Sequence, residues 1–172
     1  MPTLLLLRHA KSSWDDPELG DHERPLNKRG SKSAPRIGRY LDAAGLIPDL
    51  VLSSDAVRTR ATVALVLAEL SNSPREVHYE AGLYLAEPGD ILRRLQSLAA
   101  PEKTVLVVGH NPGLHMLALS LVGGGAAQAI ARLAQGFPTA ALAVFDVKGK
   151  DWSDLAPGRC ALTDFIVPRD LD

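Results

Sequence analysis

Two short, unbroken apolar runs constrain the fold of this chain more than any other feature. Residues 4–7 and 105–108 contain only leucine and valine, and each run is far too short to cross a membrane as a helix. A continuous apolar run of this length is typical of a strand that is covered on both faces, as in a parallel sheet between two layers of helices. The runs therefore predict an α/β protein.

Strand-like and helix-like patterns alternate along the chain, and this alternation predicts a three-layer α/β/α sandwich with a mostly parallel central sheet. No linker or internal repeat interrupts the alternation, so residues 1–172 are expected to form a single domain. The three glycines at 123–125 predict a flexible turn. Strands are expected at 3–7, 49–53, 77–79, 104–108 and 140–147, and helices at 28–44, 56–70, 88–98 and 112–122.

Composition narrows the class of protein. A hydrophobic fraction of 46% is too high for a disordered chain, and a net charge of -1 gives no overall electrostatic case for binding nucleic acid or an anionic membrane. The one cysteine, Cys160, cannot form an internal disulfide, which favours a reducing compartment. We therefore expect a cytoplasmic protein without a membrane anchor, and a monomer is the favoured oligomeric state.

Both apolar runs end in a histidine. Arg8 and His9 follow the first run, and Gly109 and His110 follow the second. The carboxyl ends of parallel strands lie at one edge of a sheet, which is where α/β proteins bind ligands, so we expect the two histidines to lie close together. The irregular segment 11–26 comes directly after His9 and is expected to lie over the same edge.

A further candidate for this edge is Arg58. A strand ends near Ser53 and a helix begins near Ala56, so Arg58 is placed in the first helical turn. A cation there opposes the helix dipole, which suggests that Arg58 has an anionic partner. Arg60, two residues further on, must point elsewhere and is expected to be solvated.

These four side chains suit a phosphoryl group. A neutral imidazole can attack phosphorus and form a phosphohistidine, and two guanidinium groups can bind the phosphate oxygens. A second histidine can donate a further hydrogen bond. This chemistry requires no metal and no cofactor. The sequence therefore predicts a phosphoryl-transfer site that contains Arg8, His9, Arg58 and His110.

The same residues resemble the motifs of the histidine phosphatase superfamily, whose members share the phosphoglycerate mutase-like fold. Arg8-His9-Ala10 is similar to the family's Arg-His-Gly, Ser54 to Arg58 with Thr62 is similar to its central element, and Gly109-His110 is similar to its late Gly-His. Alanine stands at position 10 where most of the superfamily has glycine. The resemblance is strongest to the SixA-like phosphohistidine phosphatases, and segments 8–14, 21–30, 108–113 and 138–140 carry it.

The resemblance also implies roles for individual residues. His9 would be the nucleophile, and Arg8, Arg58 and His110 would bind the phosphoryl group. Arg24 matches an additional arginine that SixA-like proteins place near the phosphate.

The general acid has two candidates. Glu80 follows the third predicted strand, where many superfamily members have an acidic residue, whereas Asp21 matches an aspartate that SixA-like proteins carry in the loop before Arg-Pro-Leu. Asp21 is preferred. A phosphohistidine substrate would reduce the need for either group, because a protonated imidazole leaves readily.

The expected activity is that of a phosphatase that works through a phosphohistidine on His9 and acts on phosphohistidine-bearing proteins. A phosphatase for small phosphomonoesters and a phosphomutase remain alternatives on the same fold, and a non-catalytic module that binds a phosphorylated ligand is a third. The segment between Tyr79 and Pro88 leaves little room for the enclosing insertions of a mutase.

Overall fold

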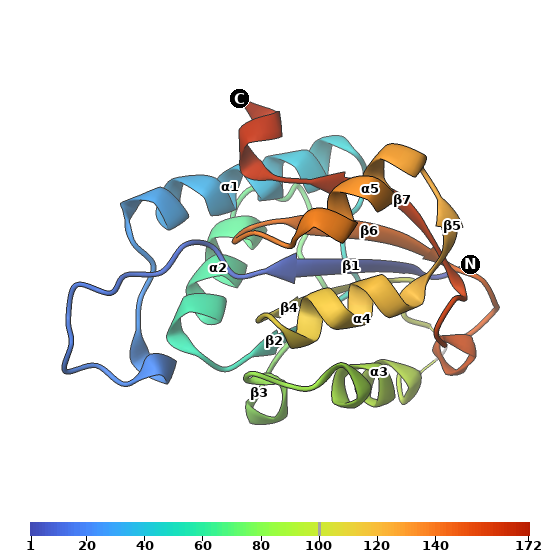
Figure 1. Ribbon diagram of the computed structural model, residues 1–172, viewed down its shortest axis with the longest axis horizontal. Coiled ribbons are helices and arrows are strands. Elements are labelled where there is room, and N and C mark those ends of the chain that lie inside the picture. Colours follow the sequence, from blue (N-terminus) through green and yellow to red (C-terminus); the bar gives the residue numbers. More distant parts are fainter. Residues whose placement is uncertain (100) are drawn as a thin grey trace.

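The computed structural model describes residues 1–99 and 101–172, in which seven strands form one sheet (Figure 1). The order across the sheet is β3-β2-β4-β1-β6-β7-β5. The strands are β1 (Thr3–Arg8), β2 (Leu50–Ser54), β3 (Glu76–Glu80), β4 (Thr104–Gly109), β5 (Val122–Gly125), β6 (Leu142–Val147) and β7 (Cys160–Ile166). β6 runs antiparallel to both of its neighbours, and the other strand pairs are parallel, as the predicted mostly parallel sheet requires.

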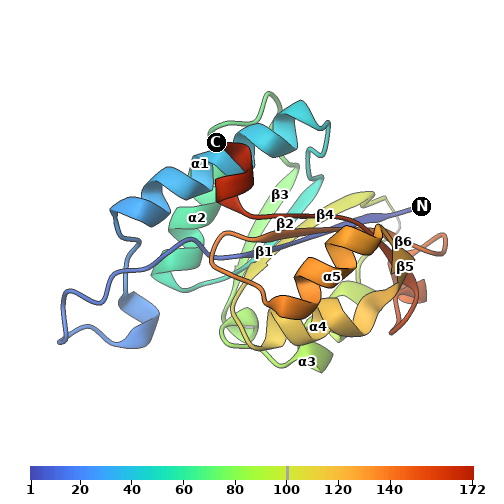
Figure 2. The ribbon, with the colours of Figure 1, turned by 45° about the horizontal axis from the view of Figure 1, so that its top comes forward.

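Helices cover both faces of this sheet (Figure 2). One face carries α1 (Lys28–Ala43) and α2 (Val57–Leu67). The other carries α3 (Pro88–Gln96), α4 (Gly113–Leu121) and α5 (Ala127–Gln135). Short 3₁₀ turns are η1 (Asp21–Glu23), η2 (Ala81–Leu83), η3 (Trp152–Asp154) and η4 (Pro168–Leu171). The three-layer α/β/α prediction is confirmed.

The central strand shows why its apolar run is continuous. Leu4 and Leu6 belong to the core cluster beneath α3, α4 and α5, whereas Leu5 and Leu7 belong to the cluster beneath α1 and α2. Successive side chains of a strand point to opposite faces, so a strand with a helical layer on each side must be apolar at every position. β4 repeats this pattern beside β1, with all of its side chains from Val105 to Val108 buried.

The predicted turn at 123–125 is wrong, because these glycines form the edge strand β5. Gly124 pairs with Ala161 and Gly125 with Leu162 in β7. A Cβ added to Gly125 would lie 2.1 Å from the carbonyl oxygen of Leu162, so the absence of a side chain is what lets the two backbones approach. The elements β7 and α5 were also not predicted from the sequence.

Within residues 1–99 and 101–172, no helix is long and apolar enough to cross a membrane.

Candidate active site

The candidate site lies at the carboxyl edge of the two central strands. β1 ends at Arg8, which pairs with Gly109 at the end of β4, so His9 and His110 leave the sheet side by side. Their ring centroids are 5.3 Å apart, and the amide of His9 donates to the carbonyl oxygen of Gly109 at 3.1 Å. Parallel pairing of two distant segments therefore brings the two predicted histidines together.

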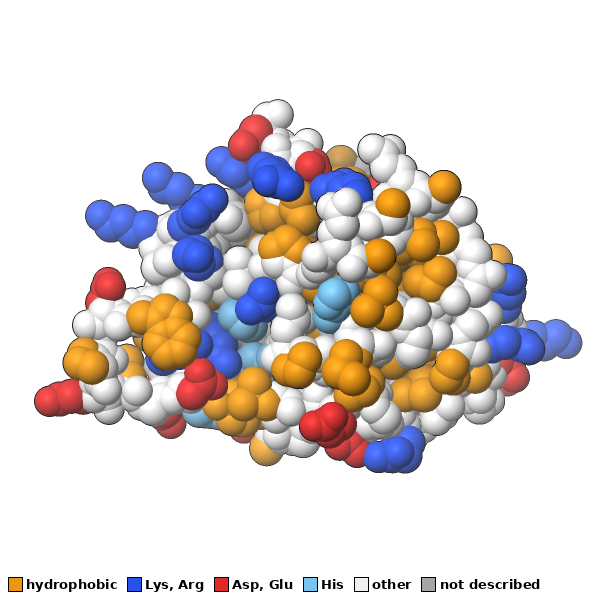
Figure 3. All heavy atoms as spheres, in the orientation of Figure 1, with side chains coloured by type: hydrophobic (Ala, Val, Ile, Leu, Met, Phe, Trp, Pro, Cys, Tyr) orange, Lys and Arg blue, Asp and Glu red, His pale blue; other side chains and the backbone are white. Residues whose placement is uncertain are grey.

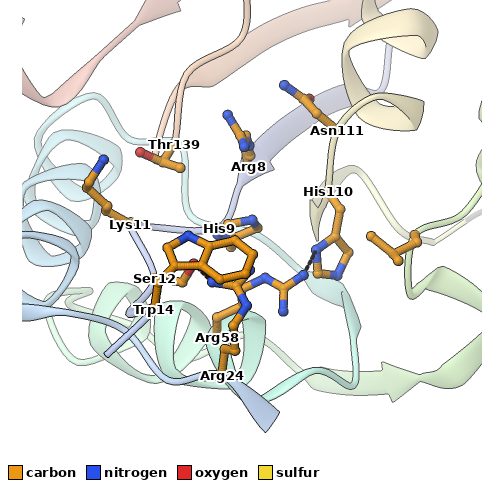
Figure 4. Close-up of a pocket in the computed structure, with 11 residues that line it drawn as sticks. Arg8, His9, Lys11, Ser12, Trp14, Arg24, Arg58, His110, Asn111 and Thr139 are labelled. Carbon is orange, nitrogen blue, oxygen red and sulfur yellow. Dashed lines mark hydrogen bonds between the residues drawn. The ribbon is translucent and has the colours of Figure 1, made fainter. Parts of the chain in front are cut away.

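Arg58 reaches the same place from α2. β2 ends at Ser54 and α2 begins at Val57, which puts Arg58 in the first turn of the helix, as the sequence predicts. Arg58 is only 2% exposed, and its Nη2 lies 3.2 Å from His110 Nδ1 (Figure 4). α2 is tied to the segment after β1 by the amide of Ala10, which donates to Thr62 Oγ1 at 3.0 Å.

These side chains surround a pocket of about 260 Å³. In Figure 3 the pocket region appears as a hollow in which histidine and arginine side chains are visible from outside. Among the described residues, Nε of Arg8 and Nε of Arg58 are buried donors without a hydrogen-bond partner. Arg8 and Arg58 both line this pocket, and a pair of guanidinium groups in one pocket suits an oxyanion ligand. The lining residues are Arg8, His9, Lys11, Ser12, Trp14, Arg24, Arg58, Leu85, His110, Asn111 and Thr139.

The environment of His9 makes it a neutral imidazole with one free nitrogen. Its Nδ1 lies 2.7 Å from the carbonyl oxygen of Ala10, an acceptor only, so Nδ1 carries the proton and Nε2 carries the lone pair. Burial lowers the pKa of His9 to about 4, with a further lowering by Arg58 and Arg8, although the bond to Ala10 acts in the opposite direction. At neutral pH His9 Nε2 can therefore act as a nucleophile.

His110 is neutral for the same reasons, in the opposite tautomer. Its Nδ1 accepts from Arg58, so its Nε2 carries the proton and donates to Ser54 Oγ at 2.8 Å. Burial lowers the pKa of His110 to about 3, and the charge of Arg58 lowers it further. The ring is thereby held in place against both β2 and α2.

Asp21 joins the arginines of this site. Its carboxylate lies 3.0 Å from Arg58 Nη2 and 3.0 Å from Arg24 Nη2, and it also accepts a hydrogen bond from the hydroxyl of Tyr84. The hydrogen bond from Tyr84, followed by those from Arg58 and Arg24, holds the pKa of Asp21 below its usual range. Asp21 is therefore a carboxylate at neutral pH, and it occupies guanidinium donors that a phosphate would also use.

Arg24 is buried in the wall of the pocket. Its Nη1 donates to Ser12 Oγ at 2.7 Å, and its guanidinium lies 3.5 Å from the centroid of the Trp14 ring. The other face of that tryptophan is open to solvent, since the side chain is 74% exposed. The structure therefore places the additional arginine of the sequence prediction beside Arg58, with an aromatic cover.

Glu80, the alternative acid, lies elsewhere. It ends β3 and forms an ion pair of 2.8 Å with Arg94 of α3, and it does not line the pocket. The hydrogen bond from Arg94 to the Glu80 carboxylate raises the pKa of Arg94. Of the two candidate carboxylates, the structure brings Asp21 and not Glu80 to the arginines.

Sequence reasoning did not single out Tyr84, although its hydroxyl binds Asp21 and its ring meets the His110 ring edge-on at 5.3 Å. No motif marks this tyrosine, because it reaches the site only through the turn η2 that follows β3.

Among the described residues, no group of three or more His, Cys, Asp or Glu side chains is arranged to hold a metal ion.

Comparison with known proteins decides the family. The model of the histidine phosphatase superfamily (branch 1) matches residues 4–90 of this chain. The chain belongs to the histidine phosphatase superfamily. Membership of this superfamily implies a phosphatase activity that works through a histidine.

Relatives match this histidine phosphatase chain over different lengths. An uncharacterised protein of Mycobacterium tuberculosis is 38% identical over 165 residues, which are 95% of this chain and 100% of the relative. A 2,3-bisphosphoglycerate-dependent phosphoglycerate mutase of Nitrobacter winogradskyi is 32% identical over 90 residues, 51% of this chain and 44% of the mutase.

Solved structures give the same family and a SixA-like fold. The crystal structure of a candidate phosphohistidine phosphatase SixA from Agrobacterium tumefaciens matches with a TM-score of 0.81 and 30% identity, over 98% of this chain and 99% of that one. A protein histidine phosphatase SixA complexed with tungstate matches in fold, with a TM-score of 0.79 and 22% identity over 99% of both chains.

Proposed function

We propose that this protein is a phosphatase that forms a phosphohistidine on His9 and removes phosphoryl groups from histidine side chains of other proteins. The observation that carries the proposal is the convergence of His9 and His110 with the buried side chains of Arg58 and Arg24 around one pocket. The SixA-like fold supports the same assignment. Residues 1–172 would form one catalytic domain, since all of the described strands belong to a single sheet.

In the first step, His9 Nε2 would bond to phosphorus while the bond between phosphorus and the substrate's imidazole breaks. Arg8 and Arg58, which both line the pocket, would bind the phosphoryl oxygens through their guanidinium groups. Arg24 would add a third guanidinium from the wall. These fixed cations would neutralise the charge of the transferring group without a metal or cofactor.

The ionisation of Asp21 favours this substrate class. A carboxyl group whose pKa is held below its usual range is ionised at neutral pH and has no proton to donate, whereas an alkoxide leaving group needs a proton. A phosphohistidine whose second ring nitrogen is protonated needs no further proton, because its imidazole leaves as a neutral ring. In the second step the Asp21 carboxylate would accept a proton from the water that attacks phospho-His9, which releases phosphate and restores the imidazole.

The test is a substrate panel assayed with the wild type and with His9→Ala. The panel contains a histidine-phosphorylated peptide, phosphoramidate, p-nitrophenyl phosphate and 3-phosphoglycerate. We expect the phosphohistidine peptide to have the highest kcat/KM, and we expect His9→Ala to lose hydrolysis of every substrate. Full activity of His9→Ala would overturn the proposed mechanism. A preference for p-nitrophenyl phosphate would overturn the substrate class, and interconversion of phosphoglycerates without phosphate release would show a mutase.

A further inference from the structure

A second hollow, of about 290 Å³, adjoins the candidate active site. The two are continuous, because Lys11 and Thr139 line both of them. Its other walls come from α1 and from the chain around η4, and they are part cationic and part apolar. We call this hollow the basic groove; it is lined by Lys11, Arg29, Ser33, Pro138, Thr139, Val167, Pro168 and Arg169.

No salt bridge of the described residues neutralises the positive charge of the basic groove, although Arg169 interacts through its charge with the neighbouring Asp170. Lys11, Arg29 and Arg169 are exposed, and no carboxylate of the described residues forms an ion pair with any of them. The nearest acidic side chains along the chain already have partners, since Asp170 pairs with Arg132 and Asp172 pairs with Arg36. In Figure 3 the Lys and Arg side chains gather over α1 and the C-terminal segment, beside the histidines.

The fold holds these cations together. The carbonyl oxygen of Lys11 accepts from the amide of Asn27 at 3.0 Å, and the Asn27 side chain caps the start of α1 through the amide of Gly30 at 2.9 Å. Lys11 is thereby fixed beside the helical turn that carries Arg29. On the other side, the C-terminal segment is held on α1 by the ion pair of Arg36 and Asp172 (Figure 2).

Three unpaired cations around one hollow repel one another in a chain whose net charge is -1, so they destabilise the free protein unless an anion is near. Pro138, Val167 and Pro168 give the same hollow an apolar wall, which a bare phosphate would not contact favourably. A ligand with both acidic groups and aliphatic stems, such as a peptide segment containing Asp or Glu, matches both properties.

We propose that the basic groove binds an acidic segment of the protein whose phosphohistidine is being hydrolysed, next to the phosphorylated residue. This inference rests on the proposed function, and it adds a site that selects the substrate. The phosphoryl group would enter the pocket at His9, and the acidic side chains would lie against Arg29 and Arg169. Lys11, which borders both hollows, would contact the segment where it passes from one to the other.

The experiment compares two histidine-phosphorylated peptides that differ only in having Glu or Gln beside the phosphohistidine. The protein variant is Arg29→Glu/Arg169→Glu. Arg29→Glu places an acidic side chain in the first turn of α1, where the helix dipole favours it, so the variant is expected to fold. The control variant is Lys148→Glu/Lys150→Glu, which makes the same change of net charge at exposed positions. These positions lie in the loop after β6, and β6 ends beside Pro2, at the end of the sheet opposite to the active site.

In the wild type, kcat/KM for the Glu peptide should exceed that for the Gln peptide by about tenfold at low ionic strength, and salt should reduce the difference. The preference should disappear in the groove variant, with the change mainly in KM, and it should persist in the Lys148/Lys150 control. Hydrolysis of phosphoramidate, which has no flanking segment, should change far less than hydrolysis of the Glu peptide.

Equal cleavage of both peptides by the wild type, or a preference that survives in the groove variant, would overturn the proposed groove. Binding of an unphosphorylated, fluorescently labelled Glu peptide, measured by anisotropy, tests the groove separately from turnover. If neither phosphopeptide is hydrolysed, the proposed function fails. The anisotropy measurement would then still test the groove. Binding by the wild type that is lost in the groove variant would support the groove, and equal binding by the two proteins would contradict it.

Discussion

Arg58 is a cation buried at the positive end of a helix, a position that both the helix dipole and desolvation disfavour. Asp21 and His110 Nδ1 offset part of this cost, yet Nε of Arg58 has no partner among the described residues. A side chain kept in such a place is typical of a binding site. The local sequence was enough to suggest an anionic partner for Arg58, because the dipole argument needs only the start of the helix.

Arg58→Ala should lower kcat/KM for a phosphohistidine peptide by about 10²–10³-fold, the usual effect of removing one donor to a transition-state oxyanion. Arg60→Ala is the matched control, since Arg60 is exposed and lies over the Tyr79 ring at 4.3 Å. Arg58→Lys should not restore activity, because an ammonium group cannot reproduce the fork of donors. Similar kinetics for the two alanine variants would contradict the role of Arg58.

Asp21→Asn should separate anion binding from turnover. The Asp21 carboxylate competes with a phosphate-like oxyanion for Arg58 and Arg24, so its removal should tighten tungstate binding by about three- to tenfold, the strength of a partly exposed charge pair. Hydrolysis should slow, since the proton acceptor is lost. Calorimetric titration with tungstate and steady-state kinetics measure the two effects. Asp15→Asn, in the exposed part of the same loop, is the control. If Asp21→Asn bound tungstate more weakly than Asp15→Asn does, the Asp21 carboxylate would not compete with oxyanions for the arginines.

At the scale of single residues, the sequence predicted the positions of Arg8, His9 and His110 well, because each lies directly after an apolar run. It could not predict that Tyr84 binds Asp21, since that contact joins the loop before α1 to the turn after β3. Such a contact depends on how two irregular segments fold over the sheet edge, and neither segment has a periodic pattern.

Among the helices, the packing of α1 on α2 holds Arg58 against the end of the sheet. Gly38 of α1 lies against the backbone of α2, and a Cβ added to Gly38 would be 2.4 Å from the carbonyl oxygen of Val66. The sequence marks Gly38 only as a weak helix former within an otherwise helical pattern. The structure gives the reason for the glycine, which is close approach of two backbones.

Gly38→Ala should therefore destabilise the protein by about 1–3 kcal/mol, as overpacking of a closed interface does, despite the higher helix propensity of alanine. Gly89→Ala in α3 is the control, because its Cβ would meet only the flexible Arg93 side chain at 3.4 Å. That variant should be neutral or more stable by up to about 1 kcal/mol. Urea unfolding measures both free energies, and a stabilised Gly38→Ala protein would show that the helices have room to separate.

The edge of the sheet was the least predictable element. Residues 123–125 lack any side chain, and β7 mixes exposed and buried positions without the continuous apolar run of β1. β5 pairs with β7, and the paired residues lie more than thirty positions apart in the chain. The strand pattern of β1 and β4, in contrast, reflects burial by complete helical layers and is visible in the sequence alone.

For the protein as a whole, the buried histidines predict a pH dependence of stability. The pKa of His9 is lowered from 6.5 to about 4 and that of His110 to about 3, so the unfolded chain binds more protons than the folded one in this range. Stability from these groups is complete above pH 6.5 and is lost as the pH falls towards 4 and 3.

Calorimetry between pH 7 and pH 5 should show a falling Tm, by about 2–4 °C for each kcal/mol lost. His110→Gln should have a shallower slope, whatever its absolute Tm. If the slope of Tm against pH were the same in His110→Gln as in the wild type, burial of a neutral His110 would not contribute to the pH dependence of stability.

The most direct test of the account is to trap the phosphorylated enzyme. The protein is mixed with a radioactively labelled phosphohistidine peptide, quenched in alkali, in which phosphohistidine survives, and mapped by mass spectrometry. We predict an acid-labile phosphoryl group on His9 Nε2 in the wild type and none in His9→Asn. A label on any other residue, or turnover by the wild type that never places phosphate on His9, would contradict the central role of this histidine.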